Sequence, residues 1–430
     1  MSVDLENSQT PHTPLWTLKA CQLLGAAAWA CFGRFINVFW SDVGVTRAEI
    51  GALSLATMIA SFIGQLFWSM VTDRLGEYKR VLVGTSLAGT IIIFFNLVPA
   101  VQVSFWWLAL VCVSSSFFLS TGGPIIDAMC LSVLAEQESE EQYGEQRLWC
   151  AVGWGGMSLI AGQLIDTFGL GFMFWGFASI QAIYLSVCLF YMPMRKNKQQ
   201  AGSGEQSLTL KQFLNFDVLW FFANLIVYGL AMSVVESFLL VFLNEDFNDT
   251  PKVLLGASTT VMCLFEVPVF RYIDSLWAER KERLTSVLMA CKLVLAFRCF
   301  CYTLLPASNP WLVLLIEPLH GFTFAAMWSA TVEYGQRIAP PGCVARMQAL
   351  VNGIYYQIAM GIGTAMWGPL VMQPPGGLGF QNCFRLDAAG IILWGLIWQA
   401  GLMIRRRRQA ARSAAIITAE QPLAEIAPQA

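Results

Sequence analysis

The segment TDRLGEYKR (residues 72–80) follows a long apolar run and places one acid, Asp73, before a cluster of bases. A second segment, IDSLWAERKER (residues 273–283), repeats this order with Asp274, which is 274 − 73 = 201 positions later. A short loop beside a membrane is often basic on its own, so the shared acid-then-base order is the informative feature. Internal repetition is common in membrane proteins built from two related bundles. The pair therefore predicts a chain made of two similar halves.

The composition is that of a membrane protein. Of the 430 residues, 56% are apolar and 13% are charged, and the mean hydropathy is +0.58. A soluble domain carries about 25% charged residues. We expect no nucleic-acid partner, because basic residues are confined to short loops and the tail. The twelve cysteines form no C-x-x-C pair, so the sequence predicts neither a metal site nor a disulfide framework.

Twelve apolar runs are long enough to cross a bilayer as helices of about 20 residues. The expected fold is all-α, with twelve transmembrane helices in two six-helix bundles. The predicted spans of the first bundle (16–194) are 16–40, 46–71, 79–100, 104–135, 146–169 and 171–194. Those of the second bundle (212–404) are 212–244, 252–276, 283–305, 309–335, 343–372 and 386–404. The segments 1–15, 195–211 and 405–430 are expected to be a cytosolic tail, a cytosolic linker and a second cytosolic tail.

Basic residues predict the orientation of the spans. With a cytosolic N-terminus, twenty Lys and Arg residues fall on the cytosolic side. The opposite side has three, Arg47, Lys252 and Arg385. An excess of Lys and Arg marks cytosolic loops. Both termini are therefore expected in the cytosol.

The segment YGEQRLWCAVGWG (residues 143–155) brings an arginine to the start of an apolar helix. Trp154 follows Arg147 by seven residues, or two helical turns, so both lie on one face. A guanidinium offers donors in a fixed geometry, and an indole offers a flat apolar surface. The alternative is that Arg147 reaches the lipid headgroups and Trp154 fills a helix contact.

Several segments resemble known families. DRLGEYKR resembles the loop motif of the major facilitator superfamily, which implies a gating role for Asp73, Arg74, Gly76, Arg80 and, in the second half, Asp274. GGPIIDA (122–128), YGEQRLWCAVGWG and LHGFTFAAMWSA (319–330) resemble the branch that contains lactose permease, nucleoside–proton symporters and the major-facilitator-associated proteins. APPGCVARMQALVNGIYY (339–356) is most similar to the last group. The resemblance covers all twelve predicted spans.

The resemblance implies a substrate site between spans 4 and 5. In lactose permease, a carboxylate and an arginine orient the sugar hydroxyls, and a tryptophan stacks on the sugar ring. Asp127, Arg147 and Trp154 occupy those positions here. Aspartate replaces the glutamate of lactose permease and is one methylene shorter, so the sugar specificity does not transfer with the motif.

Ionisable side chains at bilayer depth cost at least a few kcal/mol each and are therefore functional candidates. Arg34 on span 1 is predicted to bind an anionic or hydroxyl-rich part of a solute; the alternative is an ion pair with Asp127 or Glu236. A second alternative is that all these charges pair in a purely structural network. The remaining candidates are Glu236, Glu266, Lys292, Arg298, Glu317 and His320.

Span 10 is where related symporters carry their proton. Glu317 and His320 are spaced i and i+3, and Arg298 lies on the neighbouring span, so the three could form a proton-binding cluster. The acidic positions of lactose permease and of the nucleoside symporters, however, are Thr323 and Ala325 here. Proton coupling would then depend on Glu317, Glu236 or Glu266.

The function that these observations favour is a secondary active transporter for a small polar organic solute, such as a sugar, a nucleoside or an organic acid. Proton-coupled symport is the expected energy source. A non-transporting membrane receptor or scaffold with the same fold is the alternative. No nucleotide-binding motif and no set of nucleophile and base is evident, so an enzyme is not expected. The expected partners are the solute, protons and the lipid bilayer, with no cofactor and a monomeric chain.

Overall fold

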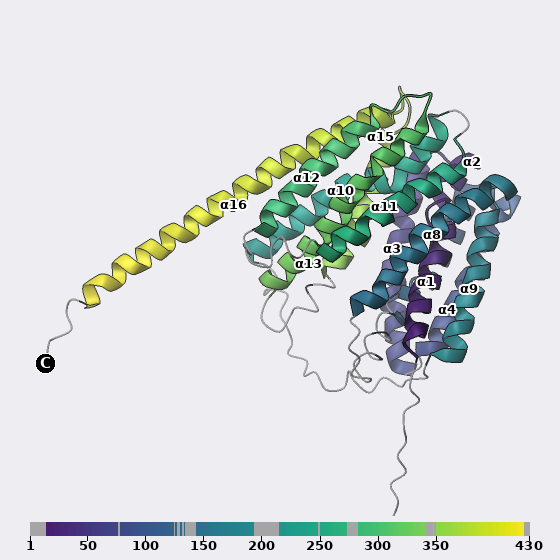
Figure 1. Cartoon of the computed structure of the whole chain (residues 1–430), viewed down its shortest axis with the longest axis horizontal. Coiled ribbons are helices and arrows are strands. Elements are labelled where there is room, and N and C mark those ends of the chain that lie inside the picture. Colours follow the sequence, from purple (N-terminus) through teal and green to yellow (C-terminus); the bar gives the residue numbers. More distant parts are fainter. Residues whose placement is uncertain are drawn as a thin grey trace, which may run out of the picture.

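The computed structural model describes residues 14–75, 78–123, 125–126, 130, 133, 143–192, 215–247, 250–272, 283–339, 347 and 350–424. Most of these residues lie in helices (Figure 1). Within the described part of the chain, ten helical segments are long and apolar enough to cross a membrane. A helix satisfies its backbone hydrogen bonds internally, which is what a lipid environment requires. The chain is an integral, multi-pass membrane protein.

The helices of the first half overlap the predicted spans, and the first span is broken in two. They are α1 (Leu15–Phe32), α2 (Ile36–Asp42), α3 (Arg47–Leu75), α4 (Tyr78–Ile93), η1 (Phe94–Leu97), α5 (Pro99–Gln102), α6 (Phe105–Leu119), α8 (Tyr143–Phe168) and α9 (Phe172–Tyr191).

The helices of the second half are less regular in two places. They are α10 (Phe216–Glu245), α11 (Lys252–Tyr272), α12 (Arg283–Tyr302), η4 (Pro310–Leu315), η5 (Glu317–Leu319), η6 (Gly321–Ala326), α13 (Met327–Ile338), η7 (Gly353–Ala359), α15 (Met360–Leu370) and α16 (Phe380–Ala424). The predicted span 309–335 is a succession of 3-10 turns, a π-helical turn and an α-helix. Pro318 has no amide hydrogen to donate, which favours the break at this point.

The described helices account for most of the predicted spans. Span 4 corresponds in part to α6, which is short, and span 11 corresponds to η7 and α15. The number of twelve spans and the division into two six-helix bundles remain predictions. The last predicted span, 386–404, lies within the apolar part of α16, Phe380–Arg405. The same helix continues to Ala424 and projects beyond the other helices (Figure 1).

Two seams join the halves. In the first seam α8 packs against α11, and in the second α3 packs against α15. Both are close: a Cβ on Gly256 would lie 2.2 Å from the carbonyl oxygen of Ser158, and a Cβ on Gly51 would lie 2.6 Å from that of Thr364. Glycine at these positions lets the backbones approach, as is common between membrane helices.

Polar contacts join the halves at one end of the molecule, which we call the latch end. Arg47, at the start of α3, donates from Nε to Glu245 Oε2 at 2.7 Å and lies 3.4 Å from Asp246. Its Nη1 donates to the carbonyl oxygen of Val371 at 2.6 Å, and its guanidinium lies over the Phe380 ring. Burial raises the pKa of Asp246 above its ordinary value, although the Arg47 charge opposes the shift.

A second contact at the latch end caps a helix across the halves. Asp166, near the end of α8, accepts the backbone N–H groups of Lys252 and Val253 at 2.6 and 2.7 Å. These donors belong to the first turn of α11, where backbone N–H groups have no partner within the helix. A cavity of about 390 Å³ lies beside this cap, lined in part by Asp42, Asp166 and Lys252.

Candidate functional site

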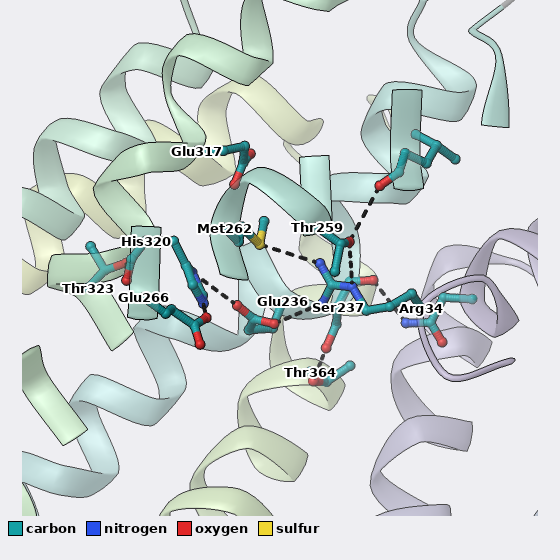
Figure 2. A network of polar contacts seen from close by, with 12 residues as sticks. Arg34, Glu236, Ser237, Thr259, Met262, Glu266, Glu317, His320, Thr323 and Thr364 are labelled. Atoms are coloured by element: carbon teal, nitrogen blue, oxygen red, sulfur yellow. Dashed lines mark hydrogen bonds and ion pairs between the residues drawn. The ribbon is translucent and has the colours of Figure 1, made fainter. Parts of the chain in front are cut away.

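A break in the first predicted span positions Arg34. Helix α1 ends at Phe32, α2 begins at Ile36, and the residues between them form a turn. The Arg34 side chain leaves this turn and reaches the second half of the chain (Figure 2). Nη1 donates to Glu236 Oε2 on α10 at 3.0 Å, and Nε donates to Thr259 Oγ1 on α11 at 3.1 Å.

The ion pair of Arg34 and Glu236 is only partly buried. The Arg34 side chain is 9% exposed and that of Glu236 is 25% exposed. Two hydrogen bonds extend the polar contacts of the two halves beside it. Asn37 Nδ2 donates to the carbonyl oxygen of Ser237 at 2.9 Å, and the hydroxyl of Ser237 lies 2.7 Å from that of Thr364. Both halves therefore contribute to one polar cluster.

His320 joins this pair to the rest of the cluster. Its Nε2 lies 2.9 Å from Glu266 Oε1, and its Nδ1 lies 3.7 Å from Glu236 Oε1 (Figure 2). The same Nδ1 lies 2.8 Å from Nη1 of Arg298. The irregular backbone around residues 316–320 carries His320 into this position. Isolated π-helical turns are frequent at functional sites.

Arg298 and Glu317 form the deepest part of the cluster. Both side chains are fully buried, and Arg298 Nη2 donates to Glu317 Oε2 at 2.8 Å. Arg298 also donates to the hydroxyls of Tyr302 at 2.7 Å and Thr323 at 3.1 Å. Tyr302 in turn donates to Glu317 Oε1 at 3.1 Å. The predicted neighbours Arg298, Glu317 and His320 therefore meet through Arg298, while Glu317 and His320 do not bond each other.

The charges of this cluster do not cancel among the described residues. Two guanidiniums, on Arg34 and Arg298, face three carboxylates, on Glu236, Glu266 and Glu317. With a neutral His320, one negative charge is left over if all three carboxylates are ionised. One bound proton, or one positive group of a solute, would balance the cluster, and a low-dielectric interior favours such balance. We call Arg34, Glu236, Glu266, Arg298, Glu317 and His320 the central cluster.

The other predicted substrate residues lie around α8. Trp154 is half-buried, and its ring would lie 3.8 Å from a Cβ on Gly33, so it flanks the turn that carries Arg34. Arg147 belongs to α8, two turns before Trp154 as predicted, but its side chain lies outside the described residues, and Asp127 lies outside them altogether. The observed partner of Arg34 is Glu236, one of the two acids that the sequence offers.

Lys292 is not part of the central cluster, contrary to the prediction. It is fully buried where α12 packs on α16. Its Nζ donates to the carbonyl oxygen of Leu288 at 3.1 Å and lies 4.1 Å from the centre of the Trp398 ring. The helix turns Lys292 and Arg298 to different faces, because six residues correspond to about 1.7 turns.

The predicted gating loop is described only in part. Asp73 and Arg74 lie in the last turn of α3, but their side chains are outside the described residues, as are Gly76 and Asp274. Arg80 is exposed on α4. Its neighbour Lys79 donates from Nζ to the carbonyl oxygen of Met192 at 2.8 Å, which ties α4 to the end of α9.

Sequence reasoning missed the uncharged members of the site. Thr259 and Met262 receive two of the contacts of Arg34, and Tyr302 and Thr323 receive two of those of Arg298. A hydroxyl on an apolar helix carries no distinctive signal. Thr323 stands out in the sequence only as the replacement for an acid. The acids of the latch end, Asp166 and Glu245, had a signal in their position at the ends of spans 5 and 7.

The sequence of this chain matches a known protein family. The model of the MFS_1-like family matches residues 15–375. A probable 3-phenylpropionic acid transporter of Escherichia coli (strain K12) is 26% identical over 187 residues, which are 41% of this chain and 46% of that protein, less than half of its length. Maltose permease of Geobacillus stearothermophilus is 23% identical over 329 residues, which are 75% of this chain and 77% of that protein.

Solved structures show the same fold. The crystal structure of the nucleoside transporter NupG has a TM-score of 0.75 at 16% identity and covers 90% of this chain and 98% of its own. A POT family transporter in complex with 5-aminolevulinic acid has a TM-score of 0.67 at 11% identity, with coverages of 90% and 95%. These relatives and fold neighbours are transporters and not enzymes. The chain therefore belongs to the MFS_1-like family of the major facilitator superfamily.

Proposed function

We propose that this protein is a secondary transporter that moves a small polar organic solute by alternating access around the central cluster. One observation carries the proposal: Arg34 from the first half and Glu236 from the second half form an ion pair that is only partly buried. A charge pair that joins two packed halves is sensitive to any movement between them. A solute bound there would touch both halves, which is what alternating access requires.

The arrangement of the latch end supports an orientation and a state. The three basic residues assigned to the non-cytosolic side from the sequence, Arg47, Lys252 and Arg385, all lie at or near that end. The proposed topology has twelve spans in two six-helix bundles with both termini in the cytosol. In this topology the latch end, with its polar contacts between the halves, faces away from the cytosol, and we propose that the structure is the cytosol-facing state.

The proposed solute site consists of Arg34, Trp154 and the exposed part of Glu236, together with Asp127 and Arg147 by resemblance. Sugars, nucleosides and organic acids all match an arginine, a carboxylate and an indole. The names of the two relatives and of one fold neighbour refer to 3-phenylpropionic acid, maltose and nucleosides, which belong to these classes.

Proton coupling is the proposed energy source. The unbalanced negative charge of the central cluster supports it, because a proton that neutralises one carboxylate removes the cost of an extra buried charge. Glu236 and Glu266 both face His320. In this proposal they bind the proton, because Thr323 and Ala325 stand at the positions where related symporters have an acid.

A binding screen tests the solute class. Purified protein is heated with sugars, nucleosides and organic acids, and the melting temperature is compared with that of the Arg147→Ala variant. We expect one class to raise the melting temperature of the wild-type protein and to lose its effect in the variant. Uptake of the same compounds into proteoliposomes, against protein-free liposomes, then separates a transporter from a receptor or scaffold. Binding without uptake would favour the receptor.

The proton hypothesis has its own measurement. Addition of the bound solute to vesicles at neutral pH should alkalinise the external medium as protons enter with the solute. Uptake with an unchanged external pH would exclude proton symport and leave uniport or another coupling ion.

A further inference from the structure

Among the described residues of the central cluster, one buried acceptor has no hydrogen-bond partner, Glu236 Oε1. Arg298 Nη1 lies 2.8 Å from His320 Nδ1. A guanidinium only donates hydrogen bonds, so Nδ1 must accept, and the proton of a neutral His320 must be on Nε2. Nε2 then donates to Glu266 Oε1 at 2.9 Å.

This assignment leaves Glu236 Oε1 without a donor among the described residues. His320 Nδ1 is 3.7 Å away and, as an acceptor, has no hydrogen to give. Arg34 donates to the other oxygen, Oε2. Oε1 is a buried atom without a hydrogen-bond partner among the described residues. A buried carboxylate oxygen without a donor is costly, and a donor from a ligand would relieve that cost. The unpaired oxygen beside Arg34 therefore favours a donor head group over an anionic one, and a head group reaches it only when the side chains around it move.

An aromatic row begins at the same histidine. His320, Phe324 and Trp328, which we call the aromatic row, follow one another at i, i+4 and i+8. The His320 and Phe324 rings are 5.5 Å apart at 16°, and the Phe324 and Trp328 rings are 6.5 Å apart at 10°. Both Phe324 and Trp328 are half-buried, so part of each ring is open to contact. The aromatic row therefore starts beside Glu236 Oε1, at His320, and runs along one face of the span.

The neighbours of the aromatic row show which way it faces. Phe270 of α11 packs edge-on against Phe324, and Tyr355 and Tyr356 of η7 pack against Trp328. α11 belongs to the seam with α8, and η7 contacts α3. Side chains that lie between these two elements of the second half are on the side turned toward the first half. This is the side on which Arg34 and Trp154 lie.

We propose that the solute carries a planar aromatic ring and a hydrogen-bond donor head, a hydroxyl or an ammonium group. The head binds Glu236 Oε1, and the ring packs on Phe324 and Trp328. Aromatic rings prefer offset or edge-on contacts with other rings, which a saturated ring of the same size does not reproduce. The inference rests on the proposed function and narrows its solute class. It separates ring-bearing donors from simple sugars and from simple carboxylic acids.

A set of five probes tests the aromatic ring and the donor head group separately. 2-Phenylethanol, phenethylamine and 3-phenylpropionate share a ring and differ in the head; 2-cyclohexylethanol and 2-cyclohexylethylamine keep the head and replace the ring. The shift in melting temperature of the purified full-length protein is titrated with each probe to obtain Kd. We expect a phenyl donor to bind about three- to tenfold more tightly than its cyclohexyl partner. We also expect it to bind more tightly than 3-phenylpropionate.

Variants assign the preference to the aromatic row. Trp328→Leu and, separately, Phe324→Leu should remove the preference for phenyl over cyclohexyl. Trp106→Leu, at an 80% exposed position on α6, should retain it. Two variants are needed because one of them can fail to fold, which size-exclusion chromatography and the melting temperature without probe will show.

Several outcomes would overturn the inference. Equal affinity for phenyl and cyclohexyl probes, no binding of any ring-bearing probe, or a ring preference that survives both row variants would exclude the ring. Tightest binding of 3-phenylpropionate would exclude the donor head. Uptake of a ringless solute that depends on Arg34 would overturn this inference while leaving the proposed function intact. No uptake of any bound compound would instead contradict the proposed function.

Discussion

Arg34 and Glu236 are 202 positions apart in the chain, and their side chains meet at 3.0 Å. Arg34 reaches Glu236 because the first span is broken at this arginine, and a continuous helix would turn the side chain elsewhere. The contact joins the two halves through atoms that are partly accessible. A bond in this position has to break or shift whenever the halves move apart, so it is the natural point at which a solute could control that movement.

Removal of Arg298 should destabilise the protein strongly. Glu317 would be left as a fully buried carboxylate without its guanidinium, and breaking a buried pair costs about 3–5 kcal/mol. The double variant Arg298→Met/Glu317→Leu should regain part of that loss, because it removes both charges. Melting in detergent measures both effects. Arg385→Met, at an exposed position with one hydrogen bond to Asn382, is the control. Equal melting temperatures for Arg298→Met and the control would contradict the prediction.

Alanine in the seam between α8 and α11 should separate the halves. A Cβ on Gly256 would lie 2.2 Å from the Ser158 carbonyl oxygen, which is backbone and cannot turn aside. Gly156 on α8 is the matched control, because a Cβ added there would meet no described atom within 4 Å. We expect Gly256→Ala to lower the melting temperature and Gly156→Ala to leave it unchanged or slightly raised, since alanine favours a helix. A neutral Gly256→Ala would show that the seam is wider than the structure has it.

The latch end should respond to pH through Asp246. Its pKa is raised above the ordinary value of 3.8, chiefly by burial. The folded protein therefore holds this proton more tightly than the unfolded chain. The favourable contribution is complete below pH 3.8 and is lost as the pH rises through the raised pKa.

Asp246→Asn should remove this part of the pH dependence. The variant is expected to melt higher than the wild-type protein at neutral pH, with the difference narrowing as the pH approaches 4. Glu49→Gln removes a charge at the same end and is the control, since Glu49 bonds Thr46 on its own helix start. A difference that is constant from pH 4 to pH 7 would indicate a packing effect instead of titration.

The sequence predicts the large-scale features because they follow from length and composition. Apolar runs of about 20 residues and the excess of basic residues on one side are strong signals. Candidate site residues can also be found, since an ionisable side chain inside an apolar run is conspicuous. Arg34, Glu236, Glu266, Arg298, Glu317 and His320 all stand out in this way, and all of them lie in one cluster.

The partners of these residues could not be predicted, because they depend on where helices bend. No proline marks the break at Gly33, Arg34 and Phe35, so the sequence does not show where the Arg34 side chain points. Its contact with Glu236 could therefore be predicted only as one of two alternatives. Lys292 has the same signal as Arg298, but helix rotation turns it toward Trp398 and away from the cluster. The seams depend on single glycines whose contacts lie on another helix, and that information is not local.

Solute exchange in proteoliposomes tests the central claim most directly. Vesicles that contain the wild-type protein, Arg34→Met, Glu236→Gln or the control Arg385→Met are loaded with a solute that the screen identifies, and entry of labelled solute is followed. The account predicts rapid exchange with the wild-type protein and Arg385→Met, and loss of at least tenfold in rate for the two cluster variants, which corresponds to about 1.4 kcal/mol. Exchange at the wild-type rate in well-folded Arg34→Met and Glu236→Gln would contradict it.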